Sequence, residues 1–279
     1  MKEIIKKLSN DFALSIDETE LLASALLQKP RFALYLQNEC SPELERHLRL
    51  KFTLLKNGVP IEYLTKQVQF LNYRLKLYPG VFIPRLETEY FVELIRKLIK
   101  FKPLKICEIG TGCGAIAIAL TESFPDAQIV ATDICELAVQ NARENILHFH
   151  LEERINLLRA DFFSPFKSRI FDLIVCNPPY VPRERIKDLP KSVRDFEPRR
   201  AIDGGKGGTR FIKKLIDEAT TYSRNHPNIA LEIDEEQTDE LSQILQNKNL
   251  PYFFAKDLFN KIRYLFIGEF NKCKVPSYL

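Results

Sequence analysis

The feature that most constrains the fold is a regular exchange of short apolar runs and helical segments after residue 88. Strands that alternate with helices in this way form a mostly parallel, doubly wound sheet with helices on both faces, in a Rossmann-like α/β arrangement. The last two runs follow each other without a helix and predict an antiparallel hairpin at the edge of the sheet. The strand-like runs lie at 105–109, 128–132, 155–158, 171–176, 229–233, 252–256 and 263–268.

The chain before residue 88 has two different patterns. Apolar residues recur at helical spacing from Ile4 to Leu55, and Pro42 after Ser41 marks the start of a helix. Apolar and polar residues then alternate between 61 and 83, which is typical of a β-hairpin. We therefore expect a helical domain at 1–60, a hairpin linker at 61–86 and an α/β domain at 87–279.

Composition excludes several classes of protein. The 279 residues include 41 basic and 37 acidic side chains, and this mild balance does not indicate nucleic-acid binding. No apolar stretch approaches the ~18 residues that span a bilayer, so we expect no membrane association. Six cysteines without a C-x-x-C pair predict neither a disulfide scaffold nor a zinc site, and we expect no metal. The charged start of the chain is unlike a secretory signal, which favours the cytoplasm.

A glycine-rich loop follows the first strand of the α/β segment. It reads Glu108-Ile-Gly-Thr-Gly-Cys-Gly114 and leads into a helix, whose N–H groups face the loop. The glycines allow a tight turn and a ligand close to the backbone. The simpler interpretation is an ordinary strand-to-helix turn with glycines for packing.

An acidic residue, Asp133, ends the next strand, where carboxylates of doubly wound sheets reach ribose hydroxyls. The loop spacing is G-x-G-x-G rather than the dinucleotide G-x-G-x-x-G, and no phosphate-binding lysine follows. A nucleoside without a pyrophosphate fits better than NAD. Because Glu108 suits a cation, S-adenosylmethionine is the favoured ligand.

The tetrapeptide Asn177-Pro178-Pro179-Tyr180 follows the apolar run 171–176. Its prolines stiffen the turn and force Asn177 into an extended backbone. The Asn177 side-chain oxygen and the Pro178 carbonyl then offer two acceptors for the two hydrogens of a planar –NH2 group, and Tyr180 offers a flat wall. Otherwise, the prolines only end the strand and Tyr180 packs in the core.

Together these motifs resemble the S-adenosylmethionine-dependent amino-methyltransferases, whose adenine-N6 and glutamine-N5 members share [DNS]-P-P-[YFW]. Three further segments resemble those of the release-factor glutamine methyltransferases, the PrmC/HemK family. These segments are PGVFIPRLETE at 79–89, VRDFEPR at 193–199 and DGG at 203–205. The resemblance covers nearly the whole chain, with departures at Leu86, Gly207 and Asp234.

The resemblance implies a seven-stranded methyltransferase sheet and methyl transfer from S-adenosylmethionine, which leaves S-adenosylhomocysteine. The substrate would be the glutamine of the Gly-Gly-Gln motif in class-1 peptide-chain release factors. Asn177, Pro178 and Tyr180 would act in catalysis, and Pro179 would join them in binding the substrate. The residues expected to bind the cofactor are Glu108, Gly110, Thr111, Gly112, Cys113, Gly114, Asp133, Asp161, Phe162 and Asn177.

Other interpretations stay open. A base also offers a primary amine, so an adenine-N6 methyltransferase of DNA or RNA is the alternative, although no long target-recognition insert is visible. A binding module without activity is another. The segment 183–200 holds seven basic and four acidic residues and is either a solvated loop or a docking surface for the protein substrate. We expect a monomer without direct nucleic-acid binding.

Overall fold

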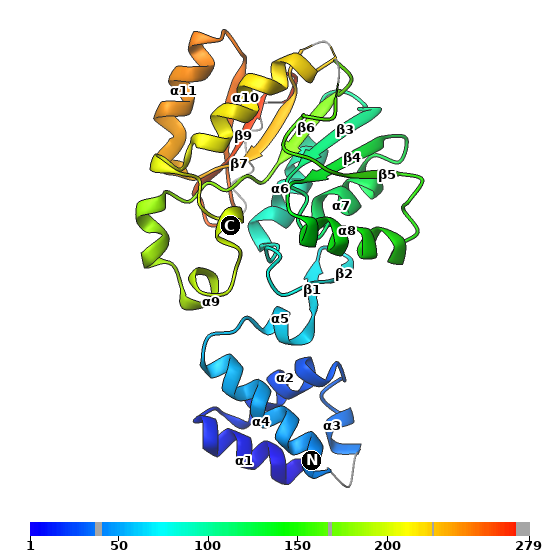
Figure 1. Ribbon diagram of the computed structural model, residues 1–279, viewed down its shortest axis with the longest axis vertical. Coiled ribbons are helices and arrows are strands. Elements are labelled where there is room, and N and C mark those ends of the chain that lie inside the picture. Colours follow the sequence, from blue (N-terminus) through cyan, green and yellow to red (C-terminus); the bar gives the residue numbers. More distant parts are fainter. Residues whose placement is uncertain (37–40, 167–168, 225, 272–279) are drawn as a thin grey trace. The chain divides into compact units, whose positions relative to one another are not determined.

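One mixed sheet organises the α/β part of the chain (Figure 1). The computed structural model describes residues 1–36, 41–166, 169–224 and 226–271. Within them, seven strands are ordered β5-β4-β3-β6-β7-β9-β8. Only β9 is antiparallel to its neighbours, which are β7 and the edge strand β8. The bounds are β3 Lys105–Ile109, β4 Gln128–Asp133, β5 Ile155–Arg159, β6 Leu173–Cys176, β7 Ile229–Glu232, β8 Tyr252–Lys256 and β9 Ile262–Ile267. The predicted fold class is confirmed.

Strand register brings the expected site residues to one edge of the sheet. Ile109 at the end of β3 is opposite Thr132 of β4 and Cys176 of β6. Cys176 is opposite Leu231 of β7 in turn. Because these strands are parallel, the glycine loop, Asp133, Asn177 and Glu232 all follow or end them at the same carboxyl edge, where ligands of open α/β sheets bind.

Helices cover both faces of the sheet (Figure 1). Alternate strand residues such as Cys107, Val130 and Ile174 pack with Leu215 and Leu241 of the helices α10 and α11. The helices α6, α7 and α8 lie on the other face (Figure 1). This alternation follows from the two-residue period of a strand. The bounds are α6 Leu86–Leu98, α7 Ala115–Ser123, α8 Glu136–His148, α10 Arg210–Tyr222 and α11 Thr238–Asn247, with 3₁₀ turns at Arg183–Asp188, Arg199–Ala201, Lys206–Gly208 and Glu235–Gln237.

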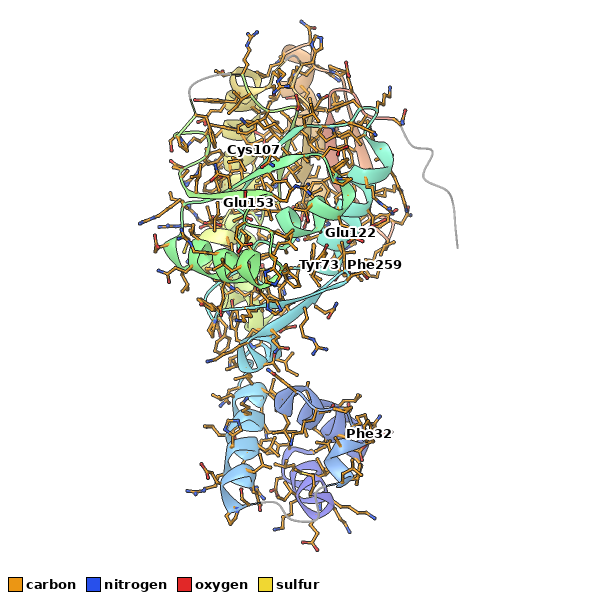
Figure 2. The ribbon with its side chains drawn as sticks, turned by 90° about the vertical axis from the view of Figure 1, so that its right-hand side faces the viewer. Phe32, Tyr73, Cys107, Glu122, Glu153 and Phe259 are labelled. Carbon is orange, nitrogen blue, oxygen red and sulfur yellow. The ribbon has the colours of Figure 1, made fainter. Side chains whose placement is uncertain are left out.

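A two-stranded hairpin, β1 (Gln67–Phe70) and β2 (Tyr73–Lys76), is tied to this body by side chains. Tyr73 lies beside Glu122 of α7, and its hydroxyl donates to that carboxylate across 3.2 Å (Figure 2). Asn145 of α8 is fully buried and accepts from the Lys76 N–H at 2.8 Å. Its amide also donates to the Cys113 carbonyl at 2.8 Å. One side chain thus connects the hairpin to the glycine loop.

The protein divides into two compact units. One comprises Met1–Gln67 and Pro190–Phe196, and the other comprises Val68–Leu189 and Glu197–Leu279. The first has its own core, which includes Leu8, Leu26 and Phe52. Ser15 and Ser41 cap their helices as their residue types predict. Its helices are α1 Lys2–Phe12, α2 Ile16–Leu27, α3 Ala33–Leu36, α4 Pro42–Lys56, α5 Ile61–Thr65 and α9 Lys191–Arg194.

Two local expectations differ from the structure. Residues Ile61–Thr65 form the helix α5 instead of the start of a hairpin, because Ile61 and Leu64 both pack on the helical core. The segment Pro190–Phe196 belongs to the helical unit, although the sequence pattern places it in the α/β domain. The sequence alone cannot show that a segment more than a hundred residues later packs with the N-terminal helices. Apart from these two segments, the division at 1–60, 61–86 and 87–279 stays a prediction.

Candidate active site

The glycine loop leaves β3 in a left-handed backbone that few residues other than glycine adopt. Gly110 and Gly112 have φ of 75° and 58°. The N–H groups of Gly110 and Thr111 donate to the Thr132 carbonyl at 2.8 and 2.9 Å. Among the described residues, no heavy atom lies within 4 Å of a Cβ built on either glycine. The loop is therefore held from below by β4 and open above, as a bound nucleoside requires.

The buried carboxylate of Glu108 holds the loop from inside. Its Oε2 accepts from the Thr111 hydroxyl at 2.7 Å and from the Ala117 N–H at 3.0 Å. Burial raises the pKa of Glu108 to about 7, against these two hydrogen bonds. Glu108 therefore fixes the loop to the first turn of α7, and its role toward a cationic ligand stays a prediction. Burial raises the pKa of Cys113 to about 12, which leaves this thiol inert.

Asp133 stands across the loop at the end of β4. Its Oδ2 accepts from the Gly112 N–H at 2.9 Å, and its Oδ1 accepts from the Cys135 N–H at 2.8 Å. Burial raises the pKa of this carboxyl, while both bonds favour its charged form. A carboxylate at this edge can accept from two ribose hydroxyls. The open glycine loop and the Asp133 carboxylate together fit the ribose of S-adenosylmethionine.

Asp161 and Phe162 follow β5 and have different environments. Asp161 is exposed, and its carboxylate pairs with the Lys214 ammonium at 3.4 Å. Phe162 is 9% exposed and lies parallel to the Phe211 ring, with 6.1 Å between ring centroids. The Lys214 Nζ lies 4.1 Å from the Phe162 centroid. Phe162 thus packs in the core, and its expected place beside adenine stays a prediction.

The Asn-Pro-Pro-Tyr turn is fixed by side chains from two other parts of the chain. Asn177 Nδ2 donates to the Thr88 hydroxyl at 3.0 Å, and this hydroxyl donates to Glu232 Oε2 at 2.9 Å. Tyr180 donates its phenol to Glu232 Oε1 at 2.9 Å. Burial raises the pKa of the Tyr180 phenol, so it stays protonated and can donate. The last residue of the motif therefore contacts this buried carboxylate directly, and the first is linked to it through Thr88.

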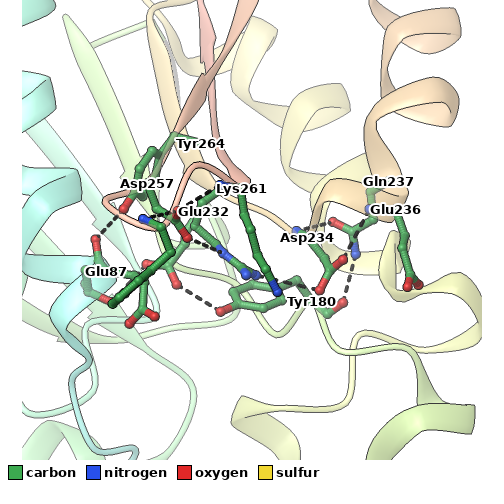
Figure 3. Close-up of polar contacts among 12 residues, drawn as sticks. Glu87, Tyr180, Glu232, Asp234, Glu236, Gln237, Asp257, Lys261 and Tyr264 are labelled. Carbon is green, nitrogen blue, oxygen red and sulfur yellow. Dashed lines mark hydrogen bonds and ion pairs between the residues drawn. The ribbon is translucent and has the colours of Figure 1, made fainter. Parts of the chain in front are cut away.

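The main chain of Tyr180 is held on its other side (Figure 3). Gln237 Nε2 donates to the Tyr180 carbonyl at 2.8 Å. Gly208 packs against the same carbonyl, and a Cβ there would stand 2.1 Å from the oxygen. Gly204 donates to the Val181 carbonyl at 2.9 Å. The Asp-Gly-Gly segment is thus a support for the turn.

The two remaining family-like segments also meet. Glu197, which is 6% exposed, accepts from the Ile83 N–H at 3.1 Å and pairs with the Arg85 guanidinium. Basic residues of the 183–200 segment have acidic partners as well, since Arg183 and Arg199 both pair with Asp203. These ion pairs support the solvated-loop interpretation over a basic docking surface.

Sequence reasoning missed three residues of this site: Thr88, Glu232 and Gln237. Thr88 lies within the segment 79–89 that carries the resemblance, and Glu232 and Gln237 lie on either side of Asp234, one of the departures from it. The available signal was a carboxylate inside the apolar run 229–233, because a charged residue in a buried strand needs a partner.

Comparison with known proteins agrees with this site. Residues 73–190 match the family described as "Methyltransferase small domain". A release factor glutamine methyltransferase of Thermodesulfovibrio yellowstonii is 33% identical over 244 residues, which cover 86% of this chain and 87% of that protein. One from Moorella thermoacetica is 36% identical, over 76% of this chain and 75% of the relative.

The chain belongs to the release factor glutamine methyltransferases. It is an S-adenosylmethionine-dependent methyltransferase. A solved methyltransferase from Pyrococcus furiosus shares the fold, with a TM-score of 0.55 and 18% identity over 79% of this chain and 97% of that one. The catalytic domain of hMettl16 also shares it, with a TM-score of 0.57 and 16% identity over 85% of each chain.

Two departures from the release factor glutamine methyltransferase pattern have a structural account. Leu86 replaces the usual proline at the first residue of α6, a position that favours proline without requiring it. Asp234 replaces the usual glycine, caps the 3₁₀ turn Glu235–Gln237 and pairs with Arg263 at 3.6 Å. Gly207, the third departure, has a left-handed backbone with φ of 64°.

In the described ranges, no helix is long and apolar enough to cross a membrane. The same residues contain no cluster of three or more His, Cys, Asp or Glu side chains that could hold a metal ion.

Proposed function

We propose that this chain methylates the side-chain amide nitrogen of the glutamine in the Gly-Gly-Gln motif of class-1 release factors. The proposal rests on the family and on one observation, the hydrogen bond from Asn177 Nδ2 to Thr88. This bond uses the donor end of the Asn177 amide and turns its oxygen to the opposite side. Asn177 Oδ1 and the Pro178 carbonyl then offer acceptors to a –NH2 group, while Tyr180 borders its plane.

The acceptors address the weakness of an amide as a nucleophile, whose nitrogen lone pair is delocalised. Two oxygens that accept from its N–H groups draw electron density toward nitrogen and fix its orientation. S-adenosylmethionine supplies an electrophilic methyl group on a sulfonium. Holding the two reactants in line removes much of the cost of a bimolecular step.

Residues of the glycine loop and Asp133 would bind the cofactor, and Asp161 and Phe162 would border its base. The roles of Pro178, Pro179 and Tyr180 in binding substrate belong to the same proposal. No strong base is required, because the methylated nitrogen is acidic and loses its extra proton to solvent. A carboxylate in place of the amide would face two acceptors, so the site selects a primary amide.

We further infer that the enzyme acts as a monomer in the cytoplasm, without direct binding to nucleic acid. The helical unit would be a docking surface for the protein substrate in addition to the active site, because a large partner needs an extended interface. These statements go beyond what the family shows.

A methylation assay read by mass spectrometry tests the function. Purified enzyme and S-adenosylmethionine are mixed with a release factor, with the same factor lacking the Gly-Gly-Gln glutamine, and with DNA duplex or RNA. We expect a gain of one methyl group on that glutamine and none in the other mixtures. Methylated adenine with an unmodified release factor would support an adenine-N6 methyltransferase instead.

A further inference from the structure

A fully buried carboxylate, Glu232, ends the internal strand β7. Ionised carboxylates are rarely buried without partners, because leaving water costs several kcal/mol. Glu232 accepts from Thr88 and from Tyr180, each at 2.9 Å. Both bonds go to side chains of this chain, and the proposed chemistry gives Glu232 no direct part.

The two hydrogen bonds that link Asn177 to Glu232 through Thr88 both donate toward Glu232. An ionised carboxylate can only accept, so Thr88 must give it its single hydroxyl proton. The Thr88 oxygen is then left as an acceptor, and only the –NH2 end of Asn177 can satisfy it. The other end of the Asn177 amide, Oδ1, must therefore point away from Thr88.

We propose that Glu232 is a positioning residue that acts through Thr88 to fix which end of the Asn177 amide faces the substrate. This inference rests on the proposed function and assigns a part of the site that selects a primary amide. Without the directional bonds, the Asn177 amide can rotate by half a turn and present donors to the substrate nitrogen. Tyr180 is the second partner of Glu232. Its hydrogen bond holds the Glu232 carboxylate in the orientation that accepts from Thr88.

Titration of Glu232 provides a way to observe this device. Burial and the neighbouring Glu87 raise its pKa, and the Arg263 charge and the bonds from Thr88 and Tyr180 oppose the rise, which leaves it at about 7. A protonated Glu232 can donate to Thr88, which frees the Thr88 proton for Asn177 Oδ1. We therefore expect kcat to fall as pH drops through about 7.

Four variants separate positioning from simple loss of packing. Thr88→Val keeps the volume and removes the hydroxyl, whereas Thr88→Ser restores it. Glu232→Gln keeps the shape and removes the charge that sets the direction. Thr121→Val is the matched control, because this hydroxyl is also buried but donates to Ile118 of its own helix.

Methylation of a release factor is measured from pH 5.5 to 8.5, together with binding of S-adenosylmethionine. We expect Thr88→Val and Glu232→Gln to lower kcat by about tenfold or more, the cost of a mispaired buried polar group. Cofactor affinity should stay within about twofold, and Thr88→Ser should recover most of kcat. Glu232→Gln should also lose the change in kcat near pH 7.

A further readout depends on the orientation of the amide alone. A release factor with Gly-Gly-Glu offers a carboxylate, which the wild-type acceptors disfavour. The ratio of its inhibition constant to the KM of the release factor should be about tenfold lower for Thr88→Val than for wild type. A destabilised but correctly oriented site would not produce this change.

The outcomes keep the two proposals apart. A wild-type enzyme that leaves the release factor unmodified overturns the proposed function. An active wild type with Thr88→Val at normal kcat, or with Thr88→Ser as slow as Thr88→Val, overturns the role of Glu232 alone.

Discussion

Gly208 lies so close to Tyr180 that a Cβ on the glycine would stand 2.1 Å from the tyrosine carbonyl oxygen and 2.5 Å from Gln237 Nε2. The φ of Gly208, 75°, also lies in the left-handed region. This glycine therefore supports the Asn-Pro-Pro-Tyr turn because it has no side chain, which leaves room for the Tyr180 carbonyl.

Gly208→Ala should lower the free energy of unfolding by about 2–4 kcal/mol, from overpacking and left-handed strain. It should also reduce kcat by at least tenfold, since the turn must move. Gly207→Ala is the matched control, because Gly207 has φ of 64° but open space around its Cβ. It should cost only about 1 kcal/mol. Urea unfolding measures both, and equal effects would contradict a steric role for Gly208.

Asn177→Ala should lower kcat by about 100-fold, comparable with the loss of one hydrogen-bonding group that acts on the reacting atoms. Its affinity for S-adenosylmethionine should change little. Rates at saturating substrate and equilibrium cofactor binding separate the two effects, with the exposed Asn247→Ala as control. A collapse of cofactor affinity with a normal saturated rate would mean that the role assigned to Asn177 is wrong.

Asp133→Ala should weaken cofactor binding by about 10–100-fold, through the loss of acceptors for two ribose hydroxyls. Glu136→Ala, an exposed change at the start of α8, should have no such effect. Titration calorimetry with S-adenosylhomocysteine measures both affinities. Unchanged binding by Asp133→Ala would remove this residue from the site.

Glu108 should make stability depend on pH. Its pKa is raised from 4.5 to about 7 by burial, so the folded protein holds a proton that the unfolded chain releases. Wild type should therefore lose about 3 kcal/mol relative to Glu108→Gln as pH rises from 4.5 to 7, with no further change above. Chemical unfolding of both proteins from pH 4.5 to 8.5 measures this. A constant difference would show that Glu108 titrates normally.

Asn145→Ala should destabilise the α/β unit by about 2–3 kcal/mol, because the Lys76 N–H and the Cys113 carbonyl lose their buried partner. Cofactor affinity should fall as well, since Cys113 lies in the glycine loop. Asn156→Ala, exposed on β5, should change neither property. If the two variants unfold alike, the hairpin and the loop are not coupled through Asn145.

Local patterns made much of the fold predictable. The glycine loop and the Asn-Pro-Pro-Tyr turn are short segments whose residue types dictate their own backbone, and both follow the strands that the apolar runs predicted. The partners of Glu232 and Gln237 could not be found in this way, because Thr88 and Tyr180 are 144 and 57 residues distant from them. Helix α5 was missed for a similar reason, since its packing on the helical core decides its conformation.

The partners in these hydrogen bonds are far apart in the sequence, which affects when the site can form during synthesis of the chain. Asn177 leaves the ribosome well before Glu232, and the Tyr264 hydroxyl that donates to Glu87 completes a pairing across 177 residues. Closing such long loops is slow and favours late assembly. A nascent chain that ends before β7 carries both signature motifs, yet it lacks the carboxylate that orients one of them. Competence for methyl transfer therefore arrives with the last strands, after the nucleoside-binding half is already made.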